Sequence, residues 1–221
     1  MSYKVGLDEA LLATVTKRFL ETKKTAPEEL KYYKVVDGVD YYVTTFGSAG
    51  GFKLINKYDR RNGETKYVKP LPKGKKEEVL ELEGFPDVES LFLGTDEYYQ
   101  DIVFDAEDIK KMIAIHDLYT KTKPFNRMYG TAVMELADGK MYFSLHDSEI
   151  TLDWHTEISA VPVEMKYHYD FELMLSIWKG FSDFKTEKVT MKVKDTNSPI
   201  YFYSKDTDYH YWFAINRKLV K

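Results

Sequence analysis

The chain contains no cysteine, which excludes a disulfide scaffold, a zinc site built from thiolates and a cysteine nucleophile. This absence fits a reducing compartment, and we expect the protein in the cytoplasm. No stretch approaches the roughly 18 consecutive apolar residues of a membrane-spanning helix, and residues 1–24 contain no apolar run suited to a signal peptide. Positive charge is not in excess either, because the net charge is -4. The protein is therefore not a uniformly basic nucleic-acid binder, although a basic patch on one face is compatible with this sum.

What the chain does contain is enough apolar and aromatic material for a large core. Hydrophobic residues make up 43% of the 221 positions, and 18 tyrosines and 13 phenylalanines account for most of the aromatic residues. Tyrosine favours half-buried pleated surfaces, so we expect much β-sheet. The length suits one large domain or two domains of ordinary size.

The N-terminal half begins with a helix and continues with strands. A possible short strand at residues 3–5 precedes a helix over residues 7–23, whose apolar residues fall at helical spacing. Strands are expected at residues 32–36, 41–46, 52–58, 65–68 and 79–82, followed by a short helix at residues 87–92. The polar, acidic residues 94–100 resemble a connector, so we place a boundary there and expect domains at 1–99 and 100–221.

The C-terminal half shows one pattern twice, a helix followed by a run of strands. A strand at residues 102–104 leads to a helix that Asp105 caps and that runs to about residue 120, with Ile109, Met112, Ile113 and His116 directed inward. A hairpin over Ala137-Asp138-Gly139 joins strands at residues 128–136 and 140–145. The remaining elements are a strand at 155–163, a helix at 171–181, and strands at 189–193, 200–204 and 209–216. The fold class is α+β.

Candidate catalytic and metal-binding motifs are weak. His146-Asp147 and Asp153-x-His155 could hold a metal ion across a loop, but no H-E-x-x-H or G-x-S-x-G pattern accompanies them, and a polar loop with surface side chains is the favoured interpretation. The glycine-rich residues 47–51 lack the Gly-Lys-Ser/Thr ending and the following helix of a phosphate loop, which favours a hairpin loop. We expect no catalytic residue, no metal and no cofactor.

The helices carry the more informative signal, which is basic. If they lie on one face of the sheet, their cations could neutralise phosphates without base-specific geometry; otherwise they are ordinary solvated helix faces. The candidate DNA-contacting residues are Lys17, Arg18, Lys24, Lys110, Lys111, Lys121 and Lys179.

Three segments resemble the DNA sliding clamp family, which includes the bacterial replicase beta subunit, proliferating cell nuclear antigen and phage processivity factors. They are the helix start Phe104-Asp105-Ala106-Glu107-Asp108-Ile109-Lys110-Lys111-Met112-Ile113, the hairpin Asp138-Gly139-Lys140-Met141-Tyr142-Phe143, and the ending Lys188-Val189-Thr190-Met191 with Asn197-Ser198-Pro199-Ile200 and Trp212-Phe213-Ala214-Ile215-Asn216-Arg217. The resemblance covers the C-terminal half. The N-terminal half follows the pattern as far as Leu82 and then lacks a clear long helix and three closing strands, which is expected of a shortened or a drifted copy.

The resemblance implies a topological function. Two clamp-like domains, each with helices on one face of antiparallel sheet, imply a homotrimeric ring around duplex DNA, with contacts to the phosphate backbone that carry no sequence information. It implies that a polymerase and a clamp loader dock by short peptides near residues 93–100 and 218–221. Two alternatives stay open: a phage-type structural or interaction protein that keeps the fold without encircling DNA, and a small metal-dependent hydrolase that uses His146 and His155.

Overall fold

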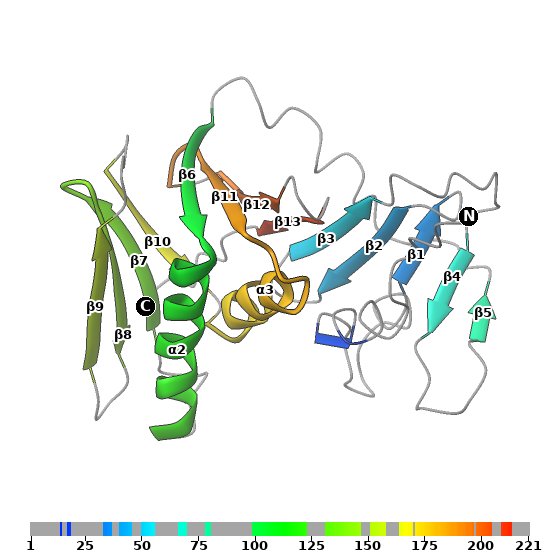
Figure 1. Ribbon diagram of the computed structural model, residues 1–221, viewed down its shortest axis with the longest axis horizontal. Coiled ribbons are helices and arrows are strands. Elements are labelled where there is room, and N and C mark those ends of the chain that lie inside the picture. The colour runs from blue at the N-terminus through cyan, green and yellow to red at the C-terminus, as the bar shows by residue number, and fades with distance from the viewer. Residues whose placement is uncertain are drawn as a thin grey trace.

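The fold of the protein, taken from a computed structural model, consists of two antiparallel sheets with helices packed against them (Figure 1). The structure describes residues 14, 17–18, 33–36, 40–45, 50–55, 66–69, 78–80, 99–122, 131–146, 151–157, 164–169, 171–196, 198–204 and 209–213. The strands of the N-terminal half are β1 (Tyr33–Val36), β2 (Asp40–Thr45), β3 (Gly50–Ile55), β4 (Lys66–Lys69) and β5 (Glu78–Leu80). Residues 14, 17 and 18 are helical, as the sequence predicts, and are called the N-terminal helical residues below.

The described residues of the C-terminal half form two helices and eight strands. They are β6 (Gln100–Asp105), α2 (Ala106–Thr122), β7 (Thr131–Ala137), β8 (Lys140–His146), β9 (Thr151–Glu157), β10 (Met165–Tyr169), α3 (Phe171–Asp183), β11 (Lys188–Val193), β12 (Ile200–Ser204) and β13 (Tyr209–Phe213). Neither α2 nor α3 is long and apolar enough to cross a membrane.

The predicted repetition of a helix followed by strands is present, and the two repeated motifs exchange strands with each other. Strand, helix and three strands occur as β6-α2-β7-β8-β9 and again as β10-α3-β11-β12-β13. The first strand of each motif pairs with the other motif, because β6 pairs with β11 and β10 pairs with β7, both antiparallel. Each motif therefore completes the sheet of the other, and neither half of this unit has a complete sheet alone.

The sheets join the two halves of the chain. One sheet has nine strands in the order β5-β4-β1-β2-β3-β13-β12-β11-β6, and the other has four in the order β10-β7-β8-β9. The junction is the antiparallel pairing of β3 with β13, from Leu54 opposite Tyr209 to Gly50 opposite Phe213. The described strands of the N-terminal half repeat the smaller sheet, since β4-β1-β2-β3 has the same order and antiparallel pairing as β10-β7-β8-β9.

The core lies where each helix packs against a sheet. Trp178 of α3 meets Phe104 and Phe202 of the nine-stranded sheet edge-on, with ring centroids 5.1 and 5.4 Å apart. His116 of α2 meets Phe143 of the four-stranded sheet at 5.7 Å. These side chains are fully or almost fully buried, so the apolar area that they remove from water stabilises both helix-to-sheet contacts.

Several predicted elements agree with the structure, and one strand prediction is wrong. The strand predicted at 155–163 is displaced, because β9 covers 151–157 and a separate strand, β10, follows at 165–169. Every second residue of β10 is buried, and this alternation is visible in Met165-Lys166-Tyr167-His168-Tyr169. The predicted strand at 3–5 and the predicted helix at 87–92 lie outside the described residues.

The glycine-rich residues 47–51 lead into a strand, as predicted, since β2 and β3 pair from Thr45 opposite Gly50. The predicted hairpin at Asp138-Gly139 is a two-residue turn between the pair Ala137 and Lys140. Both turn residues have positive φ, 51° and 73°, which is the left-handed conformation of the type I′ turn that this dipeptide favours.

Candidate nucleic-acid interface

The helices that carry the predicted DNA-contacting residues are neighbours in space. Helix α2 packs on α3, and Arg18 of the N-terminal helical residues contacts Asp183 at the end of α3. The N-terminal helical residues, α3 and α2 therefore follow one another, and Figure 1 shows them below the central strands. We call the solvent side of these three elements the helix layer. Lys17, Arg18, Lys110, Lys111 and Lys179 are distributed over these three elements.

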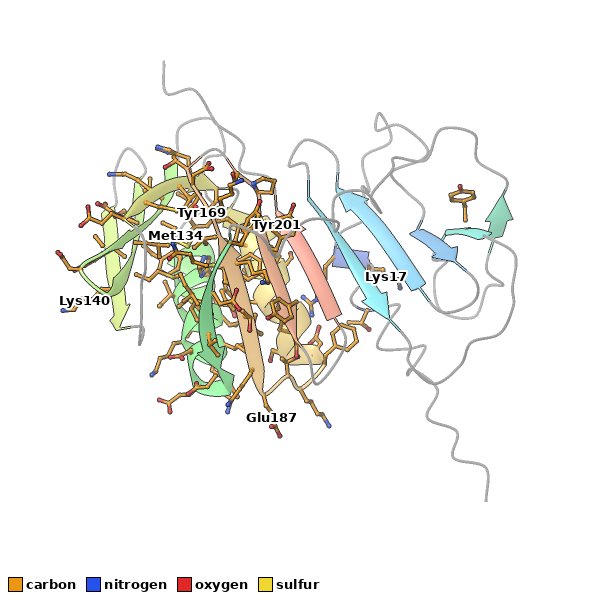
Figure 2. The ribbon with its side chains drawn as sticks, turned by 90° about the horizontal axis from the view of Figure 1, so that it is seen from above. Lys17, Met134, Lys140, Tyr169, Glu187 and Tyr201 are labelled. Atoms are coloured by element: carbon orange, nitrogen blue, oxygen red, sulfur yellow. The ribbon has the colours of Figure 1, made fainter. Side chains whose placement is uncertain are left out.

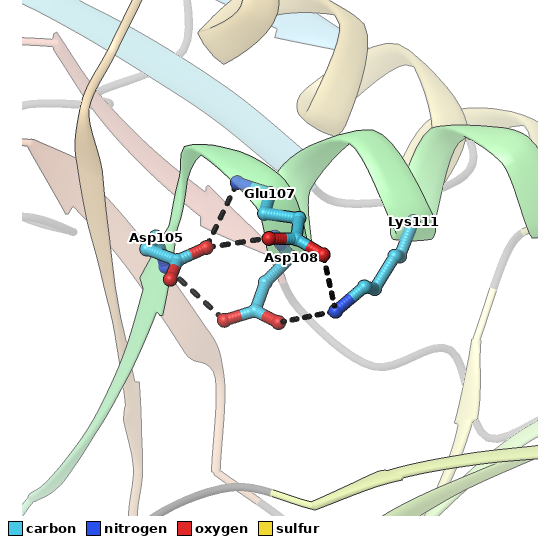
Figure 3. Close-up of polar contacts among 4 residues, drawn as sticks. All are labelled: Asp105, Glu107, Asp108 and Lys111. Carbon is cyan, nitrogen blue, oxygen red and sulfur yellow. Dashed lines mark hydrogen bonds and ion pairs between the residues drawn. The ribbon is translucent and has the colours of Figure 1, made fainter.

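Asp105 fixes the start of α2. One oxygen of its carboxylate accepts hydrogen bonds from the backbone N–H groups of Glu107 and Asp108, at 2.8 and 2.9 Å. Asp108 returns a contact to the backbone N–H of Asp105 at 3.3 Å, which makes a reciprocal capping box (Figure 3). The hydrogen bond from the backbone of Asp108 is the largest cause that lowers the pKa of Asp105. The predicted cap is thus present at the start of α2.

Lysines 110 and 111 lie next to each other on the exposed side of α2 but differ in their surroundings. The ammonium of Lys111 lies 3.1 Å from Glu107 and 3.9 Å from Asp108, and the hydrogen bond with Glu107 raises its pKa (Figure 3). Lys110 is exposed and makes no ion pair with any residue that the structure describes. Only Lys110 of these two therefore presents an uncompensated positive charge.

The other cations of the helix layer divide in the same way. Lys179 of α3 pairs with Asp117 of α2 at 2.7 Å, and Arg18 pairs with Asp183 at 2.7 Å. Lys17, labelled in Figure 2, is exposed and has no ion pair within the described part of the chain. The helix layer therefore interleaves acidic and basic side chains, an arrangement that the positions of the basic residues in the sequence do not reveal.

The structure does not describe the side chains of two predicted DNA-contacting residues. Lys24 lies outside the described residues, and Lys121 is placed only as backbone in the last turn of α2.

The two histidines of the proposed metal site lie on neighbouring strands at different heights. His146 is opposite Thr151 and His155 is opposite Tyr142, so four residues, about 13 Å of strand, separate their register positions. Among the described residues no group of three or more potential ligands is arranged to hold a metal ion. The geometry gives the hydrolase interpretation no support.

A tyrosine cluster in the C-terminal half was not predicted from the sequence. Tyr99, just before β6, meets Tyr201 of β12 edge-on with ring centroids 5.2 Å apart. Tyr167 of β10 donates a hydrogen bond to the backbone oxygen of Asp195 at 3.0 Å. Burial raises the pKa of Tyr201 to about 12, so these phenols stay neutral and can act as donors. The adjacent tyrosines 98 and 99 in the connector are the feature of the sequence that could have indicated this cluster.

Comparison with known proteins shows which fold this is. No protein-family model matches the sequence, and no curated protein matches it. Solved structures do match. The beta subunit of DNA polymerase III from Pseudomonas aeruginosa superposes with a TM-score of 0.65 at 12% identity, over 95% of this chain and 64% of that one. The beta subunit of Streptococcus pyogenes DNA polymerase gives 0.67 at 12% identity over 94% and 63%, and a putative beta subunit from Eubacterium rectale gives 0.68 at 9% identity over 98% and 68%.

This chain has the sliding-clamp fold. The match to the Pseudomonas aeruginosa structure covers most of the chain, which supports the resemblance seen in the sequence. The chain spans slightly less than two thirds of the length of the first two proteins. At these identities the likeness establishes the fold, and the interlocked motifs described above are the form that the sliding-clamp fold takes here.

Proposed function

We propose that this protein is a DNA sliding clamp: copies of the chain join head to tail into a closed trimeric ring, duplex DNA passes through the hole, and a polymerase is held on the outside. The activity is topological, so it requires no catalytic residue and no cofactor. The connector at residues 94–100 would separate the domains 1–99 and 100–221.

The observation that carries the proposal is the repeated order of the strands. In the N-terminal half, the outer edge of β3 is paired with β13. Its counterpart in the C-terminal half, β9, is the last strand of its sheet, and no described strand pairs with its outer edge. Because an unpaired strand edge is a template for another strand, β9 is where a second copy would attach.

The opposite end of the molecule supplies the complementary edge. Among the described strands, β5 ends the nine-stranded sheet, and Figure 1 places β5 and β9 at the two ends of the longest axis. Contacts between two different surfaces at opposite ends are heterologous and generate a ring if the rotation closes. The geometry therefore favours head-to-tail contacts between copies over the self-complementary contact of a two-fold dimer.

The tyrosine cluster supports the second part of the proposal. It lies where the connector enters β6, and Lys194 adds a cation 6.0 Å from the ring of Tyr99. Aromatic rings beside a cation fit a partner segment with apolar and acidic side chains. A polymerase and a clamp loader would each dock there or near residues 218–221 by a short peptide.

Two measurements test the ring. Light scattering of the full chain should give the mass of three copies, and the protein should be retained on nicked circular DNA but lost from the same DNA after linearisation. Proline variants at Asp153 and Trp154 of β9 provide a matched pair, because consecutive residues direct their N–H groups to opposite sides of a strand. The variant that loses the N–H directed away from β8 should remain folded but monomeric. The variant that loses the N–H directed towards β8 should be destabilised. A monomeric wild type, or equal retention on circular and linear DNA, would refute the ring.

A second candidate is a phage-type structural or interaction protein that keeps the fold without encircling DNA. The interleaved charges of the helix layer favour it, because Arg18, Lys111 and Lys179 already have carboxylate partners. The two candidates differ in one result. The structural protein would show no retention on nicked circular DNA at any salt concentration.

A further inference from the structure

Two ion pairs on the helix layer connect three elements through α3. Arg18 and Asp183 approach to 2.7 Å, and the residues are 165 positions apart in sequence. Lys179 and Asp117 also approach to 2.7 Å and join α3 to α2. Lys179 and Asp183 lie one helical turn apart, on the same side of α3, yet each contacts a different neighbour. Helix α3 is therefore the centre of an ion-pair relay that runs from the N-terminal helical residues to α2.

The relay differs from ordinary surface ion pairs in two respects. Its four side chains are only 26–30% exposed, whereas Lys111 and its partner Glu107, which pair within one helix, are 48% and 76% exposed. One of its two contacts also crosses between the halves of the chain, on the helix side of the β3–β13 junction. Partial burial reduces screening by salt, and a contact across the junction restricts how the two halves can move against each other.

Lys17 and Lys110 provide the contrast. Both are exposed lysines of the same helix layer, and neither makes an ion pair with a residue that the structure describes. A free ammonium can contact a phosphate without breaking an existing contact. A paired cation that moved to a phosphate would leave its carboxylate beside a polyanion, and this repulsion would oppose the gain.

We propose that the cations of the helix layer have two separate roles. Arg18 and Lys179 hold the N-terminal helical residues, α3 and α2 at a fixed spacing through Asp183 and Asp117. Lys17 and Lys110 contact the phosphate backbone of duplex DNA. The second role rests on the proposed function, whereas the first does not.

The first experiment tests the spacing role by thermal unfolding of the full chain and needs no DNA. One cycle compares Lys179→Gln, Asp117→Asn and the double variant, and the other compares Arg18→Gln, Asp183→Asn and their double variant. In each cycle the double variant should lower the melting temperature by less than the sum of the single variants, because the second change removes a partner that is already lost. Lys110→Gln is the matched control and should leave the melting temperature unchanged. Additive single effects in both cycles would overturn the spacing role.

The second experiment measures affinity for a labelled short duplex between about 50 and 200 mM NaCl. Each phosphate contact contributes about 0.9 to the slope of log affinity against log salt, so losing one changes the ratio of affinities at these two concentrations by about 3.5-fold. Lys110→Gln and Lys17→Gln should each reduce the magnitude of the slope by about 0.9. Lys179→Gln should leave the slope unchanged. Asp117→Asn removes the carboxylate partner of Lys179 and should therefore increase the magnitude of the slope.

The outcomes separate the two proposals. A slope that falls equally for Lys179→Gln and Lys110→Gln would overturn the division of roles although DNA binding is intact. A wild type without salt-dependent affinity for duplex DNA would refute the proposed function and the phosphate role of Lys17 and Lys110. In that case the spacing role is still decided by the thermal cycles.

Discussion

Acidification should destabilise this protein through one buried histidine. His116 is completely buried between α2 and the four-stranded sheet. Its Nδ1 lies 2.7 Å from the backbone oxygen of Met112, which can only accept, so Nδ1 carries the proton. Its Nε2 then accepts a hydrogen bond from the hydroxyl of Tyr169 at 3.2 Å. The structure thus holds the neutral imidazole with both nitrogens in use.

The magnitude follows from the shift in pKa. Burial, as the largest cause, lowers the pKa of His116 from 6.5 to about 4, and the nearby carboxylate of Asp117 only partly opposes this. Because the unfolded chain binds the proton more readily, stability falls as the pH drops below 6.5 and continues to fall until about pH 4. Between pH 7.5 and pH 5 the loss is about 2 kcal/mol of the free energy of unfolding.

Urea unfolding at several pH values measures this loss. The wild type is compared with His116→Gln, which keeps polar atoms at the site but cannot take up the proton. Both chains share the titration of all carboxylates, so the difference between their stability curves isolates the imidazole. The gap in stability between the two chains should narrow by about 2 kcal/mol from pH 7.5 to pH 5. Parallel curves over this range would refute the reasoning.

Substitutions at three positions test local features of the fold, each by the melting temperature. Gly139→Ala should cost about 1 kcal/mol, or about 2–4 °C, because its φ is 73° and a Cβ meets no atom within 4 Å, so only backbone strain contributes. Lys185→Gly should stabilise by about 1 kcal/mol, because Lys185 has a φ of 53° in the Schellman turn after α3, where glycine is preferred. Asp105→Ala should lower the melting temperature, while Asp105→Asn keeps a capping oxygen and should lower it less.

The sequence predicts local structure well wherever the hydrophobic period is unbroken. The strand predicted at 200–204 agrees with β12 at both ends. Of the four positions of α2 predicted to face inward, Ile109, Met112 and His116 are buried, and Ile113 is half-buried. The displaced strand at 155–163 shows the limit. Residues 158–163, Ile-Ser-Ala-Val-Pro-Val, are largely apolar and favoured one continuous strand, whereas Pro162 and Glu164 were the features of the sequence that separate β9 from β10.

The hydrophobic patterns of the sequence do not predict which distant segments pair with each other. The exchange of β6 and β10 between the two motifs depends on partners that lie far along the chain, and nothing in either strand specifies them. The helix-layer ion pairs are of the same kind. The sequence shows the position of Arg18, but only the fold shows that Asp183 faces it. Lys17, Arg18, Lys110, Lys111 and Lys179 are helical as predicted, and the sequence did not show that Arg18, Lys111 and Lys179 have carboxylate partners.

The shortened N-terminal half bears directly on how copies of the chain would join. Strand β4 enters its sheet as β10 does, but only residues 70–98 separate β4 from Tyr99, whereas α3 to β13 occupies residues 171–213. This half therefore has no room for a second complete motif, and β5 pairs with the outer side of β4 instead. In the proposed ring the junction within the chain joins β3 to β13 over five residue pairs, while the junction between copies would join β9 to the three-residue strand β5. Backbone pairing of that length is weak by itself, so side chains around β5 and β9 would have to provide most of the affinity between subunits.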